Sequence, residues 1–214
     1  GLWGLFLSGN MDISYFTIVV LGSFLTRSVG CAINDMIDIQ YDKEVNRTKN
    51  RPLANGELTF REALIFTIIL AAACLYLLSL TNIQTICLVL FVAVPMIVIY
   101  PLMKRFIAVP QLFLGATFGL SLPISYSMAE GYISLEVILL YIGCIFWILA
   151  YDSYYALCDI EDDKKININS SPIFFGADTQ KAIMLFYGLF VLIVMLLAIQ
   201  NNFKLLYYHA KSIT

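Results

Sequence analysis

Residues 34–53 read N-D-M-I-D-I-Q-Y-D-K-E-V-N-R-T-K-N-R-P-L and follow an apolar run that begins at Ile13. Asn34, Asp38 and Asp42 are spaced four residues apart, so on a helix their side chains would form one ridge of oxygen ligands. Carboxylates on one face repel each other unless a cation lies between them. Hard oxygen ligands of this kind suit Mg²⁺ bridging to a phosphate. The stretch therefore predicts a site for Mg²⁺ and a phosphorylated ligand.

Two arginines, Arg47 and Arg51, follow the ridge, and guanidinium groups are well suited to binding the remaining phosphate oxygens. The alternative interpretation is a membrane helix that runs out into a solvated, charged loop. A second acidic segment, Y-D-S-Y-Y-A-L-C-D-I-E-D-D-K-K at 151–165, also ends a long apolar run, which solvation alone explains poorly. Its residues at spacings of 3, 4 and 4 share one helical face: Asp152, Tyr155, Asp159 and Asp163.

The composition places the chain in a bilayer. Its 214 residues are 60% hydrophobic and 13% charged, with a mean hydropathy of +0.83, whereas soluble domains have about 25% charged residues. More than half of the charged residues lie in two windows, 35–62 and 152–165. The five cysteines form no C-x-x-C pair, so we expect neither a disulfide framework nor a cysteine metal site. Nothing indicates a nucleic-acid partner.

Six apolar runs approach the ~20 residues that a bilayer-spanning helix needs, and residues 1–8 form a shorter apolar fragment. We therefore expect an all-α, polytopic transmembrane bundle with six full spans and a partial first helix, forming a single domain over residues 1–214. Pro95, Pro110 and Pro123 would kink helices within it. The predicted spans are about 13–33, 63–80, 83–103, 107–128, 133–151 and 182–199.

The number of crossings places the polar segments on one face of the membrane. Two crossings separate 36–62 from 100–106, and two more separate 100–106 from 152–178. The opposite loops contain Asp12, Glu130 and Glu136 and no Lys or Arg. By the positive-inside rule the basic face is cytoplasmic, so the two acidic motifs can meet there. The basic residues of this face are Lys43, Arg47, Lys49, Arg51, Arg61, Lys104, Arg105, Lys164, Lys165 and Lys181.

The turn at 100–105 reads Y-P-L-M-K-R, and its Tyr100 and Lys104 share a helical face. An ordinary interfacial anchor would have this composition, but beside two acidic motifs we expect Lys104 and Arg105 to bind a diphosphate. Arg27 lies within the second apolar run, on the same face as Asn34. A buried membrane arginine usually faces a polar cavity or a partner, so Arg27 either lines the cavity, which we prefer, or holds a carboxylate in place.

Together these motifs resemble the UbiA family of intramembrane aromatic prenyltransferases, in particular its members that prenylate 4-hydroxybenzoate in ubiquinone biosynthesis. The stretches G-C-A-I-N-D and V-P-Q-L-F-L-G-A-T-F-G-L-S-L-P add to the resemblance, which covers about residues 20–185. It implies nine transmembrane helices around a central cavity, capped on the cytoplasmic side by helical loops.

The resemblance also implies the chemistry. Mg²⁺ would bridge the two acidic motifs to the diphosphate of a polyprenyl diphosphate, and the ring of 4-hydroxybenzoate would attack the resulting allylic cation ortho to its hydroxyl. Asp152 would orient or deprotonate the phenol, Tyr155 and Tyr100 would line the cavity, and the apolar bundle would exclude water. The implied metal-binding residues are Asn34, Asp38, Asp42, Asp159 and Asp163, and the implied diphosphate-binding residues are Arg47, Arg51, Lys104 and Arg105.

Three features depart from the family pattern. An arginine-containing opening segment is absent, and the family would add two helices after Thr214, so we expect a truncated chain; residues 201–214 do not read like a span. The second motif of the family continues K-I-G-I-K-S-T. This chain has Asn167 in place of the glycine and Asn169 in place of the lysine, and we expect these changes to remove a flexible turn and a cation.

Other functions remain open at this point. The acceptor could be homogentisate, haem or a naphthoate, as in sister enzymes of the family. Carboxylates at membrane depth also suit a cation transporter, and the departures suit an inactive structural relic. Metal-dependent binding of a prenyl diphosphate separates the enzyme from the transporter, and turnover separates it from the relic. We expect a bacterial cytoplasmic membrane or a mitochondrial inner membrane.

Overall fold

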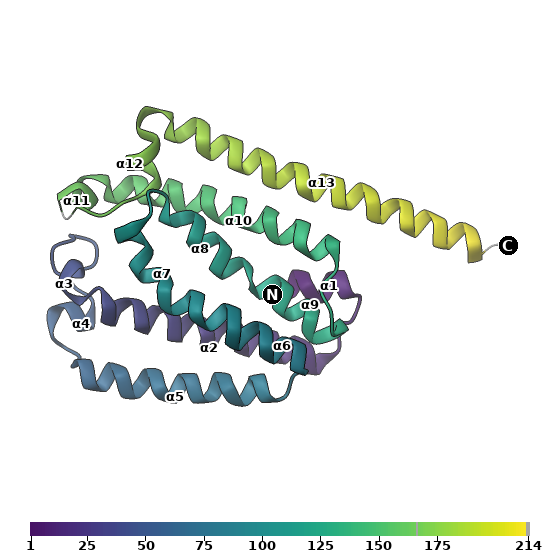
Figure 1. Cartoon of the computed structure of the whole chain (residues 1–214), viewed down its shortest axis with the longest axis horizontal. Coiled ribbons are helices and arrows are strands. Elements are labelled where there is room, and N and C mark those ends of the chain that lie inside the picture. Colours follow the sequence, from purple (N-terminus) through teal and green to yellow (C-terminus); the bar gives the residue numbers. More distant parts are fainter. Residues whose placement is uncertain (166, 213–214) are drawn as a thin grey trace.

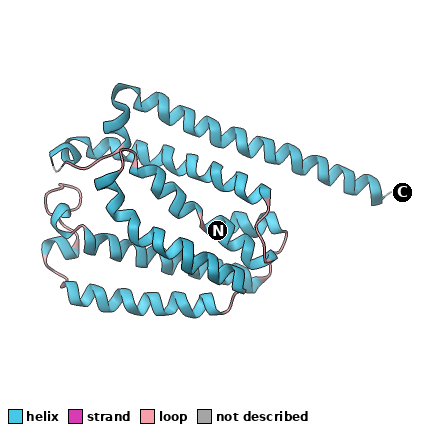
Figure 2. Cartoon of the chain, viewed as in Figure 1, coloured by secondary structure: helices cyan, strands magenta, loops and turns pink. Residues whose placement is uncertain are grey.

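The computed structural model describes residues 1–165 and 167–212, with side chains up to Asn201, and within this part of the chain every regular element is a helix (Figures 1 and 2). The predicted all-α fold is therefore confirmed. The α-helices are α1 Leu2–Ser8, α2 Ile13–Ile37, α3 Ile39–Asp42, α4 Pro52–Asn55, α5 Phe60–Ser79, α6 Ile83–Leu88, α7 Val94–Phe106, α8 Pro110–Gly119, α9 Ser121–Glu130, α10 Leu135–Ala156, α11 Ile160–Lys165, α12 Ser171–Phe175 and α13 Thr179–Ser212. Three short elements join them: the π-helix η1 Val89–Ala93 and the 3₁₀-helices η2 Leu157–Asp159 and η3 Gly176–Asp178.

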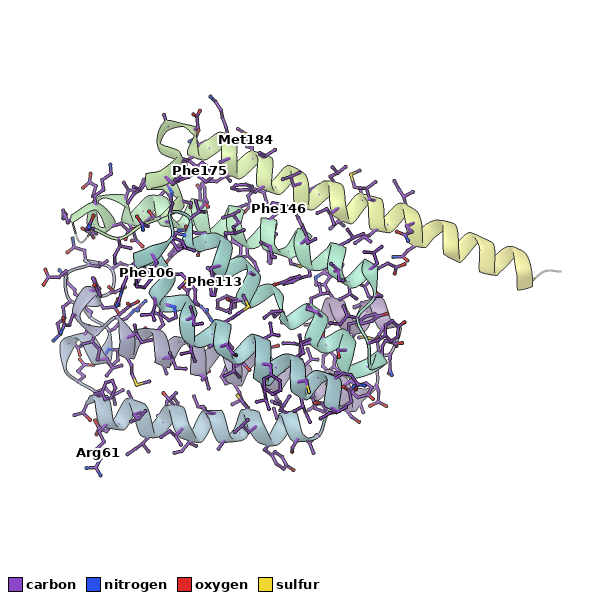
Figure 3. All side chains as sticks on the ribbon, in the orientation of Figure 1. Arg61, Phe106, Phe113, Phe146, Phe175 and Met184 are labelled. Atoms are coloured by element: carbon purple, nitrogen blue, oxygen red, sulfur yellow. The ribbon has the colours of Figure 1, made fainter. Side chains whose placement is uncertain are left out.

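Six helices in the described part of the chain are long and apolar enough to cross a membrane, which confirms the six predicted spans. Their outer surfaces carry many exposed apolar side chains, such as Phe66 on α5 and Met184 on α13, the latter labelled in Figure 3. Apolar surface on this scale suits lipid. The candidate spans are Ile13–Ile37, Phe60–Ser79, Ile83–Phe106, Pro110–Glu130, Leu135–Lys165 and Ser171–Asn201.

The helix α13 leaves the bundle as one uninterrupted rod (Figure 1). It packs along α10, and its backbone stays helical to Ser212. Residues 201–212, which we did not expect to form a span, thus continue α13 as helix beyond the sixth candidate span.

Glycines let the helices around the site approach closely. A Cβ atom on Gly115 would lie 2.9 Å from the carbonyl oxygen of Ile145, and one on Gly119 would lie 2.9 Å from the ring of Tyr141. The Tyr141 hydroxyl donates a hydrogen bond to the Ala116 carbonyl (2.8 Å). Because small residues are what permit such close packing in a membrane, α8 and α10 form a rigid pair at the centre of the bundle.

Helix irregularities lie near the three prolines. The π-helical turn η1 precedes Pro95, which lacks the N–H that a continuous α-helix would use. Pro110 begins α8, and Pro123 lies in the first turn of α9, just after α8 ends.

The two ends of the bundle differ. The short helices α3, α4, α11 and α12 gather at one end (Figure 1), as expected for polar segments on one face. An apolar core cluster joins α9, α10 and α13 toward the other end. Its members are Leu122, Tyr126, Val137, Leu140 and Leu197. Short connections at the first end therefore carry the polar chemistry, and the long helices fix their positions.

Candidate functional site

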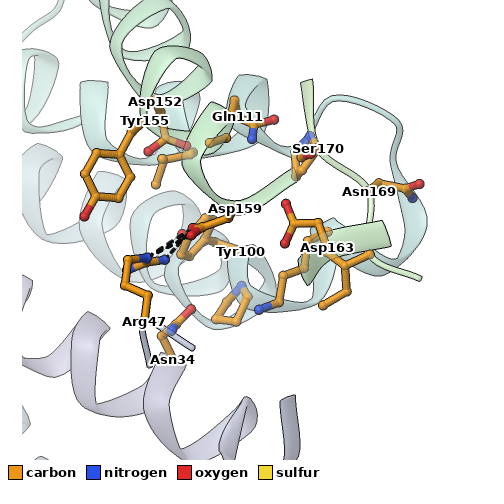
Figure 4. A pocket seen from close by; sticks show the side chains of 16 residues that line it. Asn34, Arg47, Tyr100, Gln111, Asp152, Tyr155, Asp159, Asp163, Asn169 and Ser170 are labelled. Atoms are coloured by element: carbon orange, nitrogen blue, oxygen red, sulfur yellow. Dashed lines mark hydrogen bonds and ion pairs between the residues drawn. The ribbon is translucent and has the colours of Figure 1, made fainter. Parts of the chain in front are cut away.

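A pocket of about 240 Å³ opens at the end of the bundle where α3, α4, α11 and α12 gather (Figure 4). It is enclosed by the end of α2, the loop after α3, α7, α8, the α10–α11 connection and residues 168–170. Eight of the predicted site residues line it. They are Asn34, Arg47, Tyr100, Lys104, Asp152, Tyr155, Asp159 and Asp163. The structure therefore brings both acidic motifs and the basic turn to one cavity.

Arg47 joins the two acidic segments. Its Nη2 lies 2.7 Å from Asp159 Oδ2, and its Nε lies 3.1 Å from both carboxylate oxygens. The guanidinium also lies over the ring of Tyr155, 5.4 Å from its centre. This hydrogen bonding raises the pKa of Arg47 above its ordinary value, so its positive charge persists at any physiological pH. The loop after α3 is thereby held against α11, where the Asn46 N–H also donates to Asp162 Oδ2 (3.4 Å).

The first motif differs from the predicted helical ridge. Helix α2 ends at Ile37, and Asp38 has φ −99° and ψ 7°, outside the α-helical range. The backbone bonds from Asp38 to Asn34 (2.9 Å) and from Asp42 to Asp38 (2.8 Å) persist, so the spacing of one turn is kept. Only Asn34 of the three lines the pocket. The predicted helical ridge is therefore interrupted at Asp38, and two of its three members lie outside the pocket lining.

The Asp38 carboxylate is bound by the two cations of the basic turn. Its side chain is 1% exposed and forms ion pairs with Lys104 and, at 3.1 Å, with Arg105. A lone buried carboxylate would be costly, and two cations offset that cost. The Arg105 guanidinium also lies over the ring of Tyr41 (4.6 Å). Lys104 lines the pocket, whereas Arg105 is placed behind it.

Arg51 likewise forms ion pairs with carboxylates of the first acidic motif. Its Nη1 lies 2.7 Å from Asp35 Oδ1 and 2.9 Å from Asp42 Oδ2. The Thr48 hydroxyl donates to the Asp42 carbonyl (3.1 Å) and closes the loop further. Arg51 does not line the pocket, so the structure ties it to the first motif and not directly to the cavity.

Arg27 also lies outside the pocket lining, contrary to the preferred interpretation from sequence. Its guanidinium packs over Phe118, 5.1 Å from the ring centre, and the same ring contacts Tyr100 edge to face at 6.2 Å. Arg27 lies near enough to Asp152 for their charges to interact. The other interpretation, in which Arg27 holds a carboxylate in place, stays a prediction, with Asp152 as the carboxylate.

Several lining residues were not predicted. Gln111 is buried on α8, and its Oε1 accepts a hydrogen bond from the Ser171 N–H (2.9 Å). Ser171 in turn donates to the Ser153 hydroxyl (2.6 Å). A glutamine inside an apolar run was the available signal for Gln111. Ser171 falls on the last position of the K-I-G-I-K-S-T pattern, whereas nothing in the sequence pattern marked Ser153. Further unpredicted lining residues are Pro101, Pro110, Leu114, Ala156, Ile168, Asn169 and Ser170.

The departures in the second motif have different structural consequences. Asn167 has φ +54°, a left-handed conformation that asparagine tolerates better than most residues. The left-handed turn conformation is therefore kept with asparagine in place of glycine, and the loss of flexibility stays a prediction. Asn169 lines the pocket with an uncharged amide, and its N–H donates to the Lys104 carbonyl (2.9 Å).

The donor chemistry of the pocket fits Mg²⁺ bound together with a phosphate ligand. Asn34, Asp159 and Asp163 bring oxygen donors to one cavity. Among the side chains that the structure describes, in residues 1–165 and 167–201, no three His, Cys, Asp or Glu are grouped closely enough to hold a metal ion by themselves. Mg²⁺ typically uses one or two carboxylates, waters and substrate phosphates rather than a cage of protein ligands.

Comparisons with known proteins agree with this architecture. The model of the "UbiA prenyltransferase family" matches residues 1–212. A 4-hydroxybenzoate octaprenyltransferase of Francisella tularensis subsp. mediasiatica is 39% identical over 200 residues, which cover 94% of this chain and 70% of that protein. One of Polynucleobacter asymbioticus is 41% identical over 192 residues, covering 87% of this chain and 66% of that protein.

Two solved structures share the fold. The apo structure of a UbiA homolog from Aeropyrum pernix K1 has a TM-score of 0.78 and 25% identity, covering 89% of this chain and 72% of that one. A UbiA homolog from Archaeoglobus fulgidus, bound to GPP and Mg²⁺, has a TM-score of 0.67 and 23% identity, covering 86% and 65%. With the family match along almost the entire length and with relatives near 40% identity, this chain belongs to the UbiA prenyltransferase family.

Proposed function

We propose that this protein transfers a polyprenyl group from a polyprenyl diphosphate to the ring of 4-hydroxybenzoate, ortho to the hydroxyl, with Mg²⁺ as cofactor. Residues 1–214 would act as one transmembrane domain, with its site on the cytoplasmic face of a bacterial inner membrane. The relatives named as 4-hydroxybenzoate octaprenyltransferases support the choice of substrates. The observation that carries the proposal is the single pocket lined by Asn34 of the first motif, Asp159 and Asp163 of the second, and two cations.

The diphosphate would bind between the acidic segments. Arg47 and Lys104 line the pocket and present donors to phosphate oxygens. Both also bind carboxylates, Asp159 and Asp38, and each cation has further N–H donors that can bind phosphate oxygens while these ion pairs persist. Asn34, Asp159 and Asp163 would supply the oxygen ligands for Mg²⁺. Bound Mg²⁺ would neutralise the charge that develops on the departing diphosphate.

Asp38, Asp42, Arg51 and Arg105 would support the site without lining it. Asp38 keeps Lys104 and Arg105 in position, and Arg51 ties Asp35 to Asp42. A rigid frame of this kind preorganises the charges that meet the diphosphate, so that little reorganisation is needed when the C–O bond breaks.

Asp152 would act on the acceptor. It lines the pocket one helical repeat before Asp159, with Tyr155 beside it and Arg27 near enough to influence its charge. A carboxylate here can accept the hydrogen bond of the phenol hydroxyl, which directs the ring carbon ortho to it toward the allylic centre. Leu114 and Ile168 add apolar wall to the same cavity, which limits the access of water to the cation.

A membrane cation transporter is the alternative from another class, and the charge distribution disfavours it. The sequence contains no Asp or Glu in 63–129, 137–151 or 179–214. An ion path would place polar ligands along its length, whereas here they gather at one end.

The acceptor is tested by supplying membranes that contain this chain with a polyprenyl diphosphate, Mg²⁺ and a series of acceptors. Prenylation of 4-hydroxybenzoate well above homogentisate, a dihydroxynaphthoate or haem is expected. Preference for another acceptor would keep the family chemistry and overturn the substrate assignment. Mg²⁺-dependent cation flux without prenylation would support the transporter.

A further inference from the structure

Ser170 is a buried residue in the wall of the pocket, and its hydroxyl does not cap the helix that follows it. It is 3% exposed, yet its Oγ forms no hydrogen bond of normal geometry with the described residues. Buried polar groups are nearly always hydrogen-bonded, because leaving one unsatisfied costs about 1–3 kcal/mol. A buried, unsatisfied donor that faces a ligand pocket is a candidate for binding the ligand.

The position of Ser170 makes its lack of a partner informative. It is the residue before α12, where a serine hydroxyl usually accepts a hydrogen bond from a backbone N–H of the first turn. No such bond forms here, and one candidate donor is missing because Pro172 has no N–H. Ser170 lines the pocket, and its hydroxyl lies beside the Asp163 carboxylate, near enough to interact with it although not in normal hydrogen-bond geometry (Figure 4).

The backbone on both sides of Ser170 is fixed by hydrogen bonds. Asn169 donates its N–H to the Lys104 carbonyl on α7 (2.9 Å), and Ser171 donates its N–H to Gln111 on α8 (2.9 Å). The Ser171 hydroxyl donates to Ser153 on α10 (2.6 Å). Three transmembrane helices thus hold this short segment, so the Ser170 hydroxyl is presented to the pocket with little freedom.

We propose that the Ser170 hydroxyl donates a hydrogen bond to a phosphate oxygen of the prenyl diphosphate. The inference rests on the proposed function, because it requires a diphosphate in this pocket. It adds a neutral donor across the cavity from Arg47, and the two sides of the diphosphate are then bound by different segments. Because Asn169 replaces a lysine of the family pattern and supplies no positive charge, the Ser170 hydroxyl carries more of the phosphate binding on its side of the cavity.

The test is the Ser170→Ala variant, with Ser127→Ala as its matched control. Ser127 is similarly buried (2% exposed) but lies on α9, where it accepts a hydrogen bond from Thr85 (3.3 Å). Since Ser170 caps no helix, its truncation should leave thermal unfolding unchanged. Affinities for inorganic pyrophosphate and for a short prenyl diphosphate are measured on the whole chain in detergent, at saturating Mg²⁺.

Ser170→Ala should weaken both ligands by about tenfold to a hundredfold, as expected for a lost hydrogen bond to a charged group. The KM for 4-hydroxybenzoate and the Mg²⁺ concentration for half-maximal activity should stay unchanged, and Ser127→Ala should bind both ligands as the wild type does. Unchanged affinity in Ser170→Ala would overturn the proposal. A shifted Mg²⁺ requirement with unchanged diphosphate affinity would also overturn it, because the hydroxyl would then serve Asp163. If the wild type itself binds no diphosphate, both the proposed function and the inference fail. If the wild type binds it and Ser170→Ala binds it equally well, only the inference fails.

Discussion

Arg47 and Asp159 lie 112 residues apart in the sequence and form a two-pronged ion pair, with Nη2 2.7 Å from Oδ2 and Nε 3.1 Å from both oxygens. The pair joins the loop after the first acidic motif to the second motif at the rim of the pocket. Both groups are ones that a diphosphate and its metal would engage, so this contact links substrate binding to the position of the loop.

Replacing Arg47 by Lys keeps the charge and removes the planar fork. A lysine ammonium cannot make the parallel hydrogen bonds that guanidinium makes to carboxylate or phosphate. We expect Arg47→Lys to raise the KM for the prenyl diphosphate about tenfold and to leave the KM for 4-hydroxybenzoate unchanged. Steady-state kinetics with each substrate varied in turn checks this, and an equal rise in both constants would contradict the assignment of Arg47 to the diphosphate.

The pH dependence of this contact follows from the raised pKa of Arg47. A cation whose folded pKa is raised contributes its stabilisation fully below the unfolded pKa and loses it only as the pH rises through the folded pKa, and for an arginine both lie far above physiological pH. Arg47 therefore stays charged across the practical alkaline range. The affinity for inorganic pyrophosphate of the wild type and of Arg47→Lys should keep a constant ratio between about pH 7 and 9. A ratio that collapses within this range would show that Arg47 titrates.

Asp38 and Asp159 are predicted to fail in different ways. Asp38→Ala leaves two half-buried cations, Lys104 and Arg105, without their shared carboxylate, and breaking a buried pair costs about 3–5 kcal/mol. Asp159→Ala releases Arg47, whose side chain is 44% exposed, so the free energy of unfolding should change by less than about 1 kcal/mol. Both variants should lose turnover and still insert into the membrane.

Thermal unfolding in detergent, with turnover measured on the same samples, separates the two effects. Asp178→Ala is the control, because its ion pair with Lys181 is exposed and lies away from the pocket. Full activity in both Asp38→Ala and Asp159→Ala would refute the proposed metal site and its frame.

These residues also show what the sequence could and could not predict. The length of each apolar run determines the spans, and the number of crossings places the acidic segments on one face, because both depend only on local composition. The choice of partners depends on tertiary contacts. Asp38 was predicted to bind metal because of its spacing from Asn34, but the turn at 104–105 supplies two cations to it. Gln111 and Ser170 line the pocket only because α8 and α12 meet there, which no periodic pattern indicates.

Asp152 is expected to act on the acceptor. Asp152→Asn keeps the shape of the side chain and removes the carboxylate that would orient or deprotonate the phenol. We expect kcat to fall by about 10²–10⁴-fold, with unchanged affinity for the prenyl diphosphate. Tyr155→Phe, on the same face, should have a smaller effect because its ring is retained. Single-turnover kinetics with bound donor checks this, and unchanged kcat in Asp152→Asn would exclude it from the chemistry.

The close contact between α8 and α10 should be sensitive to one added methyl group. Gly115→Ala would place a Cβ 2.9 Å from the Ile145 carbonyl, and overpacking of this kind costs about 1–3 kcal/mol. Gly22 on α2 has nothing within 4 Å of such an atom, so Gly22→Ala should be neutral or slightly stabilising. Thermal unfolding of both variants tests the packing, and equal stability would contradict it.

The most direct test of the central claim is prenyl transfer in membranes that contain this chain, with radiolabelled 4-hydroxybenzoate and a polyprenyl diphosphate, in Mg²⁺ and in a chelator. We predict a labelled lipid product that forms with Mg²⁺, disappears with the chelator and is absent in Asp159→Ala. Product formation that is unaffected by the chelator, or no product while the chain is folded in the membrane, would contradict the proposed function.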